Sequence, residues 1–203
     1  MRKPAFLQPR ILRQAISAAL SRPYTTRFPA EPFEPQASFR GRPRFHADGC
    51  IGCGACAQVC PPKCIEVVDD LEASPPLRRL VQHFDACIMC GQCERYCTTG
   101  QGIRMSTDWD TAGFRPEDFE ETLAKELVLC EVCGGLLAPA DQLRWLAARL
   151  GPIAFANPTL ALFAGLDLGC VEAGVRSTAD HALRQDRMAM QCPRCRRQSA
   201  WAA

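Results

Sequence analysis

The sequence lacks the motifs by which most enzymes are recognised. It contains no Gly-rich phosphate loop, no dinucleotide-binding fingerprint and no pattern typical of a catalytic triad. It also lacks the run of about 20 continuous apolar residues that a membrane-spanning helix needs. The most apolar stretch, residues 153–168, is too short and is interrupted by Asn157, Pro158 and Gly165. We therefore expect a chain without catalytic residues of its own, whose contact with any membrane is peripheral.

Acidic residues are absent from the first 30 positions, which hold six basic residues. Apolar residues recur there at helical spacing, so a basic amphipathic helix is predicted over residues 5–20. Arg13 and Gln14 interrupt the apolar run, which excludes a secretory signal peptide. Three interpretations stay open: a helix that docks on a membrane or a membrane subunit, a mitochondrial transit peptide, and a flexible or locally packed terminus.

Residues 23–43 contain five prolines and four aromatic residues. Proline prevents a continuous helix and favours extended chain. We predict an extended docking arm whose aromatic side chains pack on a neighbouring surface. A disordered linker is the alternative, and the aromatic content argues against it.

Cysteine, in contrast, is abundant, with 14 among 203 residues. Eight of them form two copies of the spacing C-x2-C-x2-C-x3-C, which holds [4Fe–4S] clusters in two-cluster ferredoxins. The copies are Cys50, Cys53, Cys56 and Cys60, and Cys87, Cys90, Cys93 and Cys97. A secreted disulfide scaffold is the alternative, but such chains are usually shorter, carry a signal peptide and do not repeat this spacing. The pattern therefore favours metal binding in a reducing compartment.

The fourth cysteine of each copy binds the other cluster in two-cluster ferredoxins, so the sequence predicts two crossed ligand sets. These sets are Cys50, Cys53, Cys56 and Cys97, and Cys87, Cys90, Cys93 and Cys60. Around them, Ile65–Val68 and Leu77–His83 are predicted to form paired strands, with a matching strand at Ile103 and Met105. The order of strand, cluster loop, helix and strand occurs twice, which predicts pseudo-twofold symmetry.

Two helices are predicted after the second cysteine run. Pro116 suits a first helical turn and apolar residues recur at helical spacing, which indicates a helix over residues 114–129. Asp141 is predicted to be the N-cap of a second helix, which Gly151 ends after Leu150.

Two further C-x2-C pairs, Cys130 with Cys133 and Cys192 with Cys195, lie in the C-terminal half. Four soft thiolates in tetrahedral geometry suit a structural Zn2+ ion, so a zinc-ribbon-like pair of knuckles is predicted. A rubredoxin-type iron site, a third cluster, and unmetallated or disulfide-bonded pairs are the alternatives.

Two cysteines and three histidines are left over. Cys64 is predicted to be a small buried hydrophobe, and Cys170 could replace one zinc ligand. His46 and His83 stand shortly before a cysteine run and are expected to surround the clusters without ligating them. His181 is expected on a polar helix.

These segments together resemble a known family. The sequences YTTRFP at 24–29, FRGRP at 39–43 and CIGCGAC at 50–56 resemble the arm and first cluster loop of the two-cluster ferredoxin-like subunit that respiratory complex I shares with membrane-bound hydrogenases. The version in formate hydrogenlyase and related NiFe hydrogenase complexes is also similar in the helix at Pro116–Phe119 and in its C-terminal pair of knuckles. The chain departs from this pattern at residues 151–190, which are longer than in relatives.

The resemblance implies a peripheral arm subunit that passes electrons between a partner's iron–sulfur cluster and NiFe-type large and small subunits near a membrane arm. Such a subunit would lie in the cytoplasm on the inner face of the cell membrane, or on the matrix side if residues 1–30 are a mitochondrial transit peptide. A complex-I-type NADH:quinone oxidoreductase subunit and a soluble ferredoxin shuttle are the alternative functions. A zinc-ribbon nucleic-acid protein is disfavoured, because the thiolate-rich loaded chain is expected to be anionic and its basic run at residues 194–197 is short.

We therefore predict an α+β protein with three parts. Residues 1–43 form the helix and docking arm, residues 44–106 form the ferredoxin-like domain with two [4Fe–4S] clusters, and residues 107–203 form a helical and zinc-knuckle module.

Overall fold

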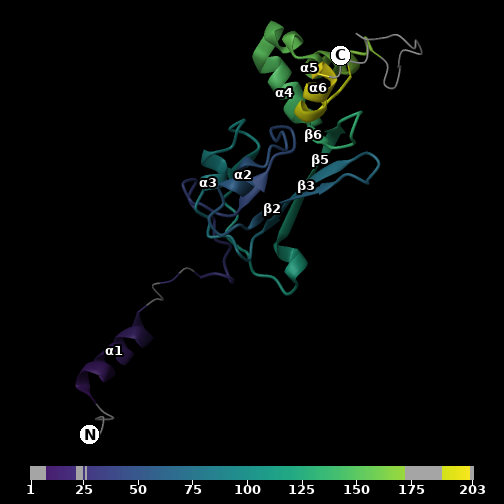
Figure 1. Ribbon diagram of the computed structural model, residues 1–203. Helices are drawn as coiled ribbons and strands as arrows, with labels where there is room; N and C mark the ends of the chain where they lie inside the picture. The colour runs from purple at the N-terminus through teal and green to yellow at the C-terminus, as the bar shows by residue number, and fades with distance from the viewer. Residues whose placement is uncertain (1–7, 22–24, 26, 172–188, 202–203) are drawn as a thin grey trace. The chain divides into compact units, whose positions relative to one another are not determined.

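The computed structural model describes residues 8–21, 25, 27–171 and 189–201 (Figure 1). The chain divides into two compact units, Met1–Ser38 and Phe39–Ala203. The expected helix around His181 lies outside the described residues. Among the residues that the structure describes, no helix is long and apolar enough to cross a membrane.

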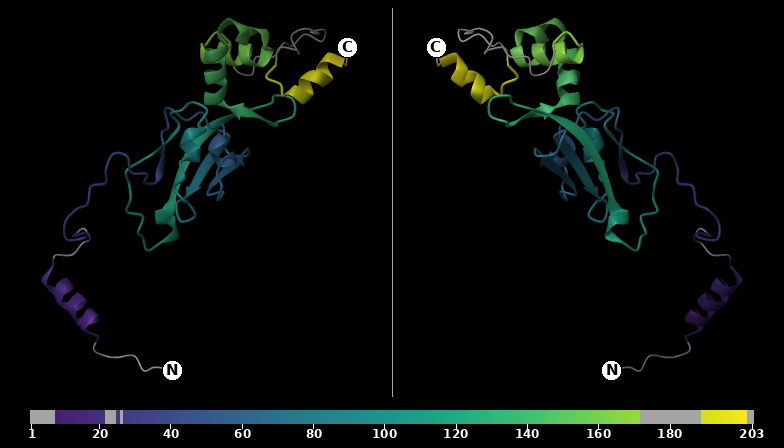
Figure 2. Two further views of the ribbon diagram at one scale, coloured as in Figure 1. Left: turned by 90° about the vertical axis from the view of Figure 1, so that its left-hand side faces the viewer. Right: turned by 90° about the vertical axis from the view of Figure 1, so that its right-hand side faces the viewer.

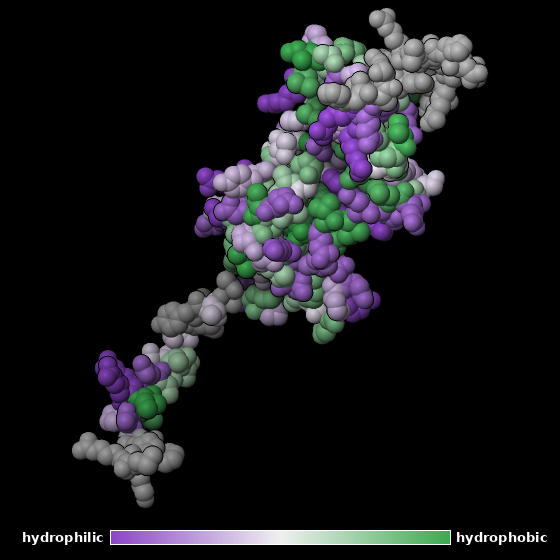
Figure 3. Space-filling view, in the orientation of Figure 1, coloured by the Kyte–Doolittle hydropathy of each residue, from purple (hydrophilic) through white to green (hydrophobic). Residues whose placement is uncertain are grey.

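The first unit contains helix α1, Pro9–Leu20, so the predicted N-terminal helix is confirmed from residue 9 onward. No residue of this helix is buried, and Ile11, Leu12, Ile16 and Leu20 are all more than half exposed. Hydrophobic and hydrophilic residues lie on different sides of α1 in Figure 3. The helix therefore keeps an apolar face that the described part of the unit does not cover.

The predicted arm contains no helix or strand between residues 27 and 42, as its prolines require. Its last residues already belong to the second unit. The Gly41 and Arg42 amides donate hydrogen bonds to the carbonyl oxygens of Ser106 and Asp108, at 2.8 and 2.9 Å. These bonds anchor the chain directly before strand β1, Pro43–Phe45.

Short helices and strands surround the cysteine runs. The elements are β1, α2 (Ala55–Gln58), β2 (Ile65–Asp70), β3 (Leu77–His83), α3 (Gln92–Arg95) and β4 (Ile103–Met105). Strands β1 and β4 pair antiparallel, and β2 and β3 form an antiparallel hairpin. The predicted strands are confirmed. A core cluster between these elements buries Cys56, Cys64, Ile65, Cys93 and Ile103.

The predicted helix over residues 114–129 is wrong. A 3-10 helix, η1, spans Pro116–Phe119, and strand β5 follows over Glu120–Leu129. Leu123 and Leu127 are spaced by four residues, which fits one face of a helix and equally one face of a strand. Pairing with β3 makes this segment a strand, because residues 120–126 of β5 pair antiparallel with all of β3.

Strand β6, Leu136–Pro139, completes a sheet with the order β2-β3-β5-β6. Strand β5 is long and runs from the η1 end of this sheet to the C-terminal helices (Figure 2). The chain after residue 107 thus shares one sheet with the hairpin between the two cysteine runs.

The C-terminal helices are α4 (Ala140–Leu150), η2 (Gly151–Ala156), α5 (Pro158–Asp167) and α6 (Pro193–Trp201). The second predicted helix is confirmed, but Pro139 occupies the N-cap and Asp141 lies inside the first turn. The Asp141 carboxylate accepts hydrogen bonds from Lys125 Nζ and Arg144 Nη1 instead, at 2.7 and 3.0 Å. These cationic partners hold the carboxylate more strongly than free helix amides would.

Candidate metal centres

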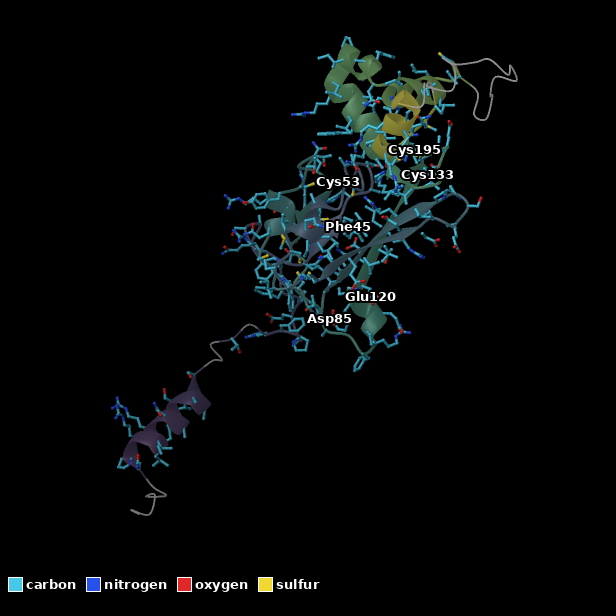
Figure 4. The ribbon with its side chains drawn as sticks, in the orientation of Figure 1. Phe45, Cys53, Asp85, Glu120, Cys133 and Cys195 are labelled. Atoms are coloured by element: carbon cyan, nitrogen blue, oxygen red, sulfur yellow. The ribbon has the colours of Figure 1, made fainter. Side chains whose placement is uncertain are left out.

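Four cysteines and a set of apolar side chains line a first cavity. The cysteines are Cys50, Cys53, Cys56 and Cys97. Phe45 of β1, Leu80 of β3 and Ile103 of β4 line the same cavity, and Phe45 and Cys53 are labelled in Figure 4. Three cysteines of the first run therefore meet the last cysteine of the second run against an apolar wall.

A second cavity receives the remaining cysteines of both runs. Its cysteines are Cys60, Cys87, Cys90 and Cys93, together with Cys64. The Sγ atoms of Cys60 and Cys64 lie 3.4 Å apart, so Cys64 adds a fifth sulfur at this cavity. The expected burial of Cys64 is confirmed at 4% exposure, and its thiol is in contact with a predicted ligand.

The backbone of each run bends to place its cysteines. Gly54 and Gly91 have φ values of 76° and 74°, and they stand at the N-caps of α2 and α3. This left-handed conformation is open to glycine at no steric cost. Gly52 at φ 69° and Met89 at φ 52° occupy corresponding positions of the two runs, so the second loop holds a methionine in a strained conformation.

Donors also surround the sulfur atoms. The Gly102 amide lies 3.3 Å from Cys97 Sγ, and the Met89 amide lies 3.4 Å from Cys87 Sγ. The Thr98 hydroxyl lies 3.2 Å from Cys53 Sγ. Hydrogen bonds of this kind stabilise thiolate ligands and help to set the potential of an iron–sulfur cluster.

Burial dominates the acidity of the inner cysteines. Desolvation raises the pKa of Cys56 to about 12 and the pKa of Cys93 to about 11. Burial also acts against ionisation at Cys97, but hydrogen bonds from Thr99 and from backbone amides outweigh it, so the pKa of Cys97 is lowered. A metal that binds here must displace protons from Cys56 and Cys93, since the thiolate is the ligand form.

The donor set of each cavity fits a [4Fe–4S] cluster. Such a cluster takes four cysteine thiolates, and each cavity is lined by four cysteines from the two repeated runs. Ile51 and Ile103, both buried, border the first cavity and exclude water from it. Bound clusters would supply one-electron redox chemistry, while the chain holds them and shields them from solvent.

Three further polar residues bond next to the cluster loops or line a cavity, and the sequence pattern did not indicate the contacts of Lys125 and Gln82. Arg78 Nη1 donates to the Gly52 carbonyl at 3.0 Å, and Lys125 Nζ donates to the Ala47 carbonyl at 2.6 Å. Gln82 lines the second cavity and is completely buried. Its position two residues after Leu80 on a half-buried strand is the one signal that could have indicated an inward-facing amide.

The four C-terminal cysteines also come together. The ligand atoms of Cys130, Cys133, Cys192 and Cys195 all lie within 4.8 Å of one another. Cys133 and Cys195, labelled in Figure 4, come from the two ends of the C-terminal half of the chain. Cys170, the considered substitute ligand, is exposed and stands outside this group.

Backbone amides point at the sulfur of Cys130, one of the two buried members of this group. Burial acts to raise the pKa of Cys130, but hydrogen bonds from the amides of Cys192, Cys133 and Val132 outweigh it and lower the pKa to about 6. The Cys192 amide lies 3.3 Å from Cys130 Sγ. These hydrogen bonds therefore favour the thiolate, the form in which cysteine binds a cation.

The two histidines near the cysteine runs do not line either cavity. His83 Nδ1 lies 3.3 Å from a Glu120 carboxylate oxygen. The His46 backbone bonds to Gly102 and Cys50 and so closes the first loop. His46 therefore supports the first loop through its backbone, and His83 contacts β5; their expected place around the clusters stays a prediction.

Known proteins share this arrangement of cysteines. A family described as "4Fe-4S dicluster domain" matches residues 49–103. Formate hydrogenlyase subunit 6 of Escherichia coli (strain K12) is 33% identical to the chain over 127 residues, which cover 62% of this chain and 68% of that protein. The chain belongs to the family of formate hydrogenlyase subunit 6.

This membership in the formate hydrogenlyase subunit 6 family confirms the resemblance predicted from the motifs. NAD(P)H-quinone oxidoreductase subunit I of Trichodesmium erythraeum (strain IMS101) is 36% identical over 63 residues, which are 29% of this chain and 30% of that protein. A chain of the membrane-bound sulfane sulfur reductase (MBS), an archaeal respiratory membrane complex, matches with a TM-score of 0.38 and 26% identity over 58% of this chain and 61% of that chain.

Proposed function

We propose that the chain is an electron-transfer subunit of a membrane-associated hydrogenase complex of the formate hydrogenlyase type. The observation that supports this most directly is the division of the eight repeated cysteines between two cavities. One cavity is lined by Cys50, Cys53, Cys56 and Cys97, and the other by Cys60, Cys87, Cys90 and Cys93. These sets are the crossed ligand sets of a two-cluster ferredoxin, so we assign one [4Fe–4S] cluster to each.

We assign a structural Zn2+ ion to the C-terminal cysteine group. Four sulfur atoms within 4.8 Å of one another suit a closed tetrahedral site, in which no position is left for a substrate. The bonds Glu131 N to Met190 O, at 2.9 Å, and Cys130 N to Gly135 O, at 2.8 Å, join the two knuckles and close the first one. An iron ion in the same place is the alternative, because thiolate ligands accept both metals.

Metal analysis tests both assignments. After anaerobic purification we expect about eight irons per chain, from two four-iron clusters, and about one zinc. Cys90→Ser should lower the iron content without changing the zinc content, and Cys133→Ser should do the reverse. Fewer than about six irons per chain would contradict the two-cluster assignment.

The partners that we propose are NiFe-type large and small subunits, a membrane arm, and an iron–sulfur subunit that donates or accepts electrons. The family relationship supports a role inside such a complex. Helix α1, whose apolar side chains are exposed, supports peripheral docking at the inner face of the cell membrane.

A soluble ferredoxin shuttle is the main rival, and a deletion separates the two functions. Removal of residues 1–38 spares β1 and the bonds of Gly41 and Arg42, so the second unit should keep its metals. A complex subunit should then fail to co-purify with its partners, whereas a shuttle should stay active. Identification of the co-purified proteins also distinguishes a hydrogenase from a complex-I-type assembly.

A nucleic-acid partner is not supported by the basic residues of α6. Arg196 Nη2 donates to the Thr159 hydroxyl, and Arg197 Nε donates to the Pro193 carbonyl at 3.5 Å. The first bond holds Arg196 against α5, whereas the second lies within α6 itself. Tight, salt-sensitive binding of DNA or RNA would contradict this view.

A further inference from the structure

The side-chain amide of Gln82 is buried at the second cavity and has no hydrogen-bond partner among the described residues. The side chain of Gln82 is 0% exposed. Within the part of the chain that the structure describes, neither its Nε2 nor its Oε1 atom has a hydrogen-bond partner. Buried polar side chains are nearly always hydrogen-bonded, so an amide in this state points to a missing partner.

The cavity beside Gln82 indicates what that partner is. Besides Gln82, the cavity is lined by Cys60, Cys64, Cys87, Cys90 and Cys93, and the remaining lining residues include Ile65, Ile88 and Met105. An amide N–H donates readily to a thiolate or sulfide sulfur, and an iron–sulfur cluster in this cavity would present several such acceptors.

Strand β3 contributes a different kind of side chain to each cavity. Residues two apart on a strand point to the same face, and on β3 these residues are Leu80 and Gln82. Leu80, also 0% exposed, lines the first cavity, whereas Gln82 lines the second. One cavity therefore meets an apolar side chain where the other meets a hydrogen-bond donor.

We propose that Gln82 donates a side-chain hydrogen bond to the cluster held by Cys60, Cys87, Cys90 and Cys93 and so raises its reduction potential. A reduced cluster carries one more negative charge than an oxidised one, and a donor aimed at its sulfur atoms stabilises the reduced form more. The contribution of β3 thus favours electron flow from the first cavity toward the second. This inference rests on the cluster assignment proposed above.

Substitutions on β3 test the proposal in the full-length chain. Gln82→Met replaces the amide by an unbranched apolar side chain of similar length, and Leu80→Met is the matched control on the same face of the same strand. The two clusters are followed separately in redox titrations monitored by electron paramagnetic resonance. For Gln82→Met we expect the ratio of reduced to oxidised second cluster at a fixed potential to fall on the order of tenfold, about 59 mV for one electron.

The first cluster should keep its potential in Gln82→Met, and both clusters should keep theirs in Leu80→Met. Unchanged potentials, or equal shifts of both clusters, would overturn the role of Gln82. Wild-type protein with fewer than about six irons would instead overturn the proposed function, since the two-cluster ferredoxin assignment requires about eight.

If Gln82→Met loses its metals, a spectroscopic measurement on a chain that keeps Gln82 can still test the hydrogen bond. Glutamine labelled with 15N in the side-chain amide is incorporated into a Gln92→Ala chain, because Gln92 also lines the cavity. A 15N hyperfine coupling on the reduced second cluster is the expected result. Its absence in a fully loaded sample would overturn the hydrogen bond.

Discussion

Lys125 Nζ lies 2.7 Å from Asp141 Oδ2 and thereby joins strand β5 to helix α4. The same ammonium group donates to the Ala47 carbonyl at 2.6 Å, directly before the first cysteine run. The Lys125 side chain is 12% exposed, while the Asp141 side chain is 38% exposed. One side chain thus connects the first cluster loop, the central sheet and the C-terminal helices.

Replacement of Lys125 by methionine should weaken this connection. The change keeps the aliphatic stem but removes both hydrogen bonds, and we expect the free energy of unfolding to fall by about 1–3 kcal/mol. Denaturant titration of the metal-loaded protein under anaerobic conditions measures this loss. Asp141→Asn is the control with the smaller effect, because its amide oxygen can still accept from Lys125 or Arg144 and the Ala47 bond is unchanged. Equal stability of Lys125→Met and the wild type would contradict the connecting role.

The ion pair between Asp69 and Arg78 should give a defined pH dependence. Arg78 donates to both carboxylate oxygens of Asp69, at 2.7 and 2.9 Å, and its hydrogen bonds and charge lower the pKa of Asp69. A carboxyl group with a depressed folded-state pKa stabilises the fold above its unfolded pKa of about 3.9, and the contribution is lost as the pH falls through the folded-state value.

We therefore expect Asp69→Asn to lower the free energy of unfolding by about 1–2 kcal/mol at neutral pH. The difference between variant and wild type should be the same at pH 7 and pH 5, because both values lie above the titration range. Denaturation midpoints at the two pH values provide the measurement. A difference that already shrinks at pH 5 would show that Asp69 titrates without the help of Arg78.

Two glycines with nearly equal φ values allow the cost of backbone strain to be compared with the cost of steric crowding around an added Cβ atom. Gly52 has φ +69°, and a Cβ atom there would lie 3.1 Å from Pro139 and 3.2 Å from Lys125. Gly100 has φ +70° with nothing within 4 Å. Alanine at either position adds strain of about 1–2 kcal/mol, which left-handed backbone costs a residue with a side chain.

Gly52→Ala should therefore destabilise the chain more than Gly100→Ala, by an additional amount of about 1 kcal/mol or more as Pro139 or the loop moves. Thermal or denaturant unfolding of both variants gives the comparison. Gly52→Ala should also lose the first cluster sooner on heating, which absorbance near the iron–sulfur charge-transfer band can follow. Equal losses of stability in the two variants would mean that the loop at Gly52 moves away from β6 without cost.

The position of Cys64 predicts that one cluster ligand can be replaced. Because Cys64 Sγ lies 3.4 Å from Cys60 Sγ at the same cavity, Cys60→Ser should retain about eight irons through a small shift of the chain. The double variant Cys60→Ser with Cys64→Ser should retain about four. Cys97→Ser is the matched control without a neighbouring spare thiol and should lose iron as a single change. Iron analysis of the three proteins tests this prediction. Complete loss of the second cluster in Cys60→Ser alone would show that Cys64 does not replace Cys60.

The repeated cysteine runs could be interpreted from the sequence, because a loop of two-residue spacing dictates locally which sulfur atoms face one side. The hairpin of β2 and β3 and the helix ending at Leu150 were predictable for the same reason, since their signals lie within a few neighbouring residues. Strand β5 was not predictable, because the spacing of Leu123 and Leu127 suits both a helix and a strand.

Residue types and their spacing along the chain were enough to predict the candidate metal ligands, the two-cluster character of residues 49–103 and the family relationship. The fold added that Gln82 meets the second cavity while Leu80 meets the first, and it brought the two predicted pairs, Cys130 with Cys133 and Cys192 with Cys195, to one site. The spacing of cysteines along the chain depends on neighbouring residues only, so it can be interpreted from the sequence. Which residue of β3 meets which cavity, and how closely distant cysteines approach, depends on strand pairing and packing between residues far apart in the chain.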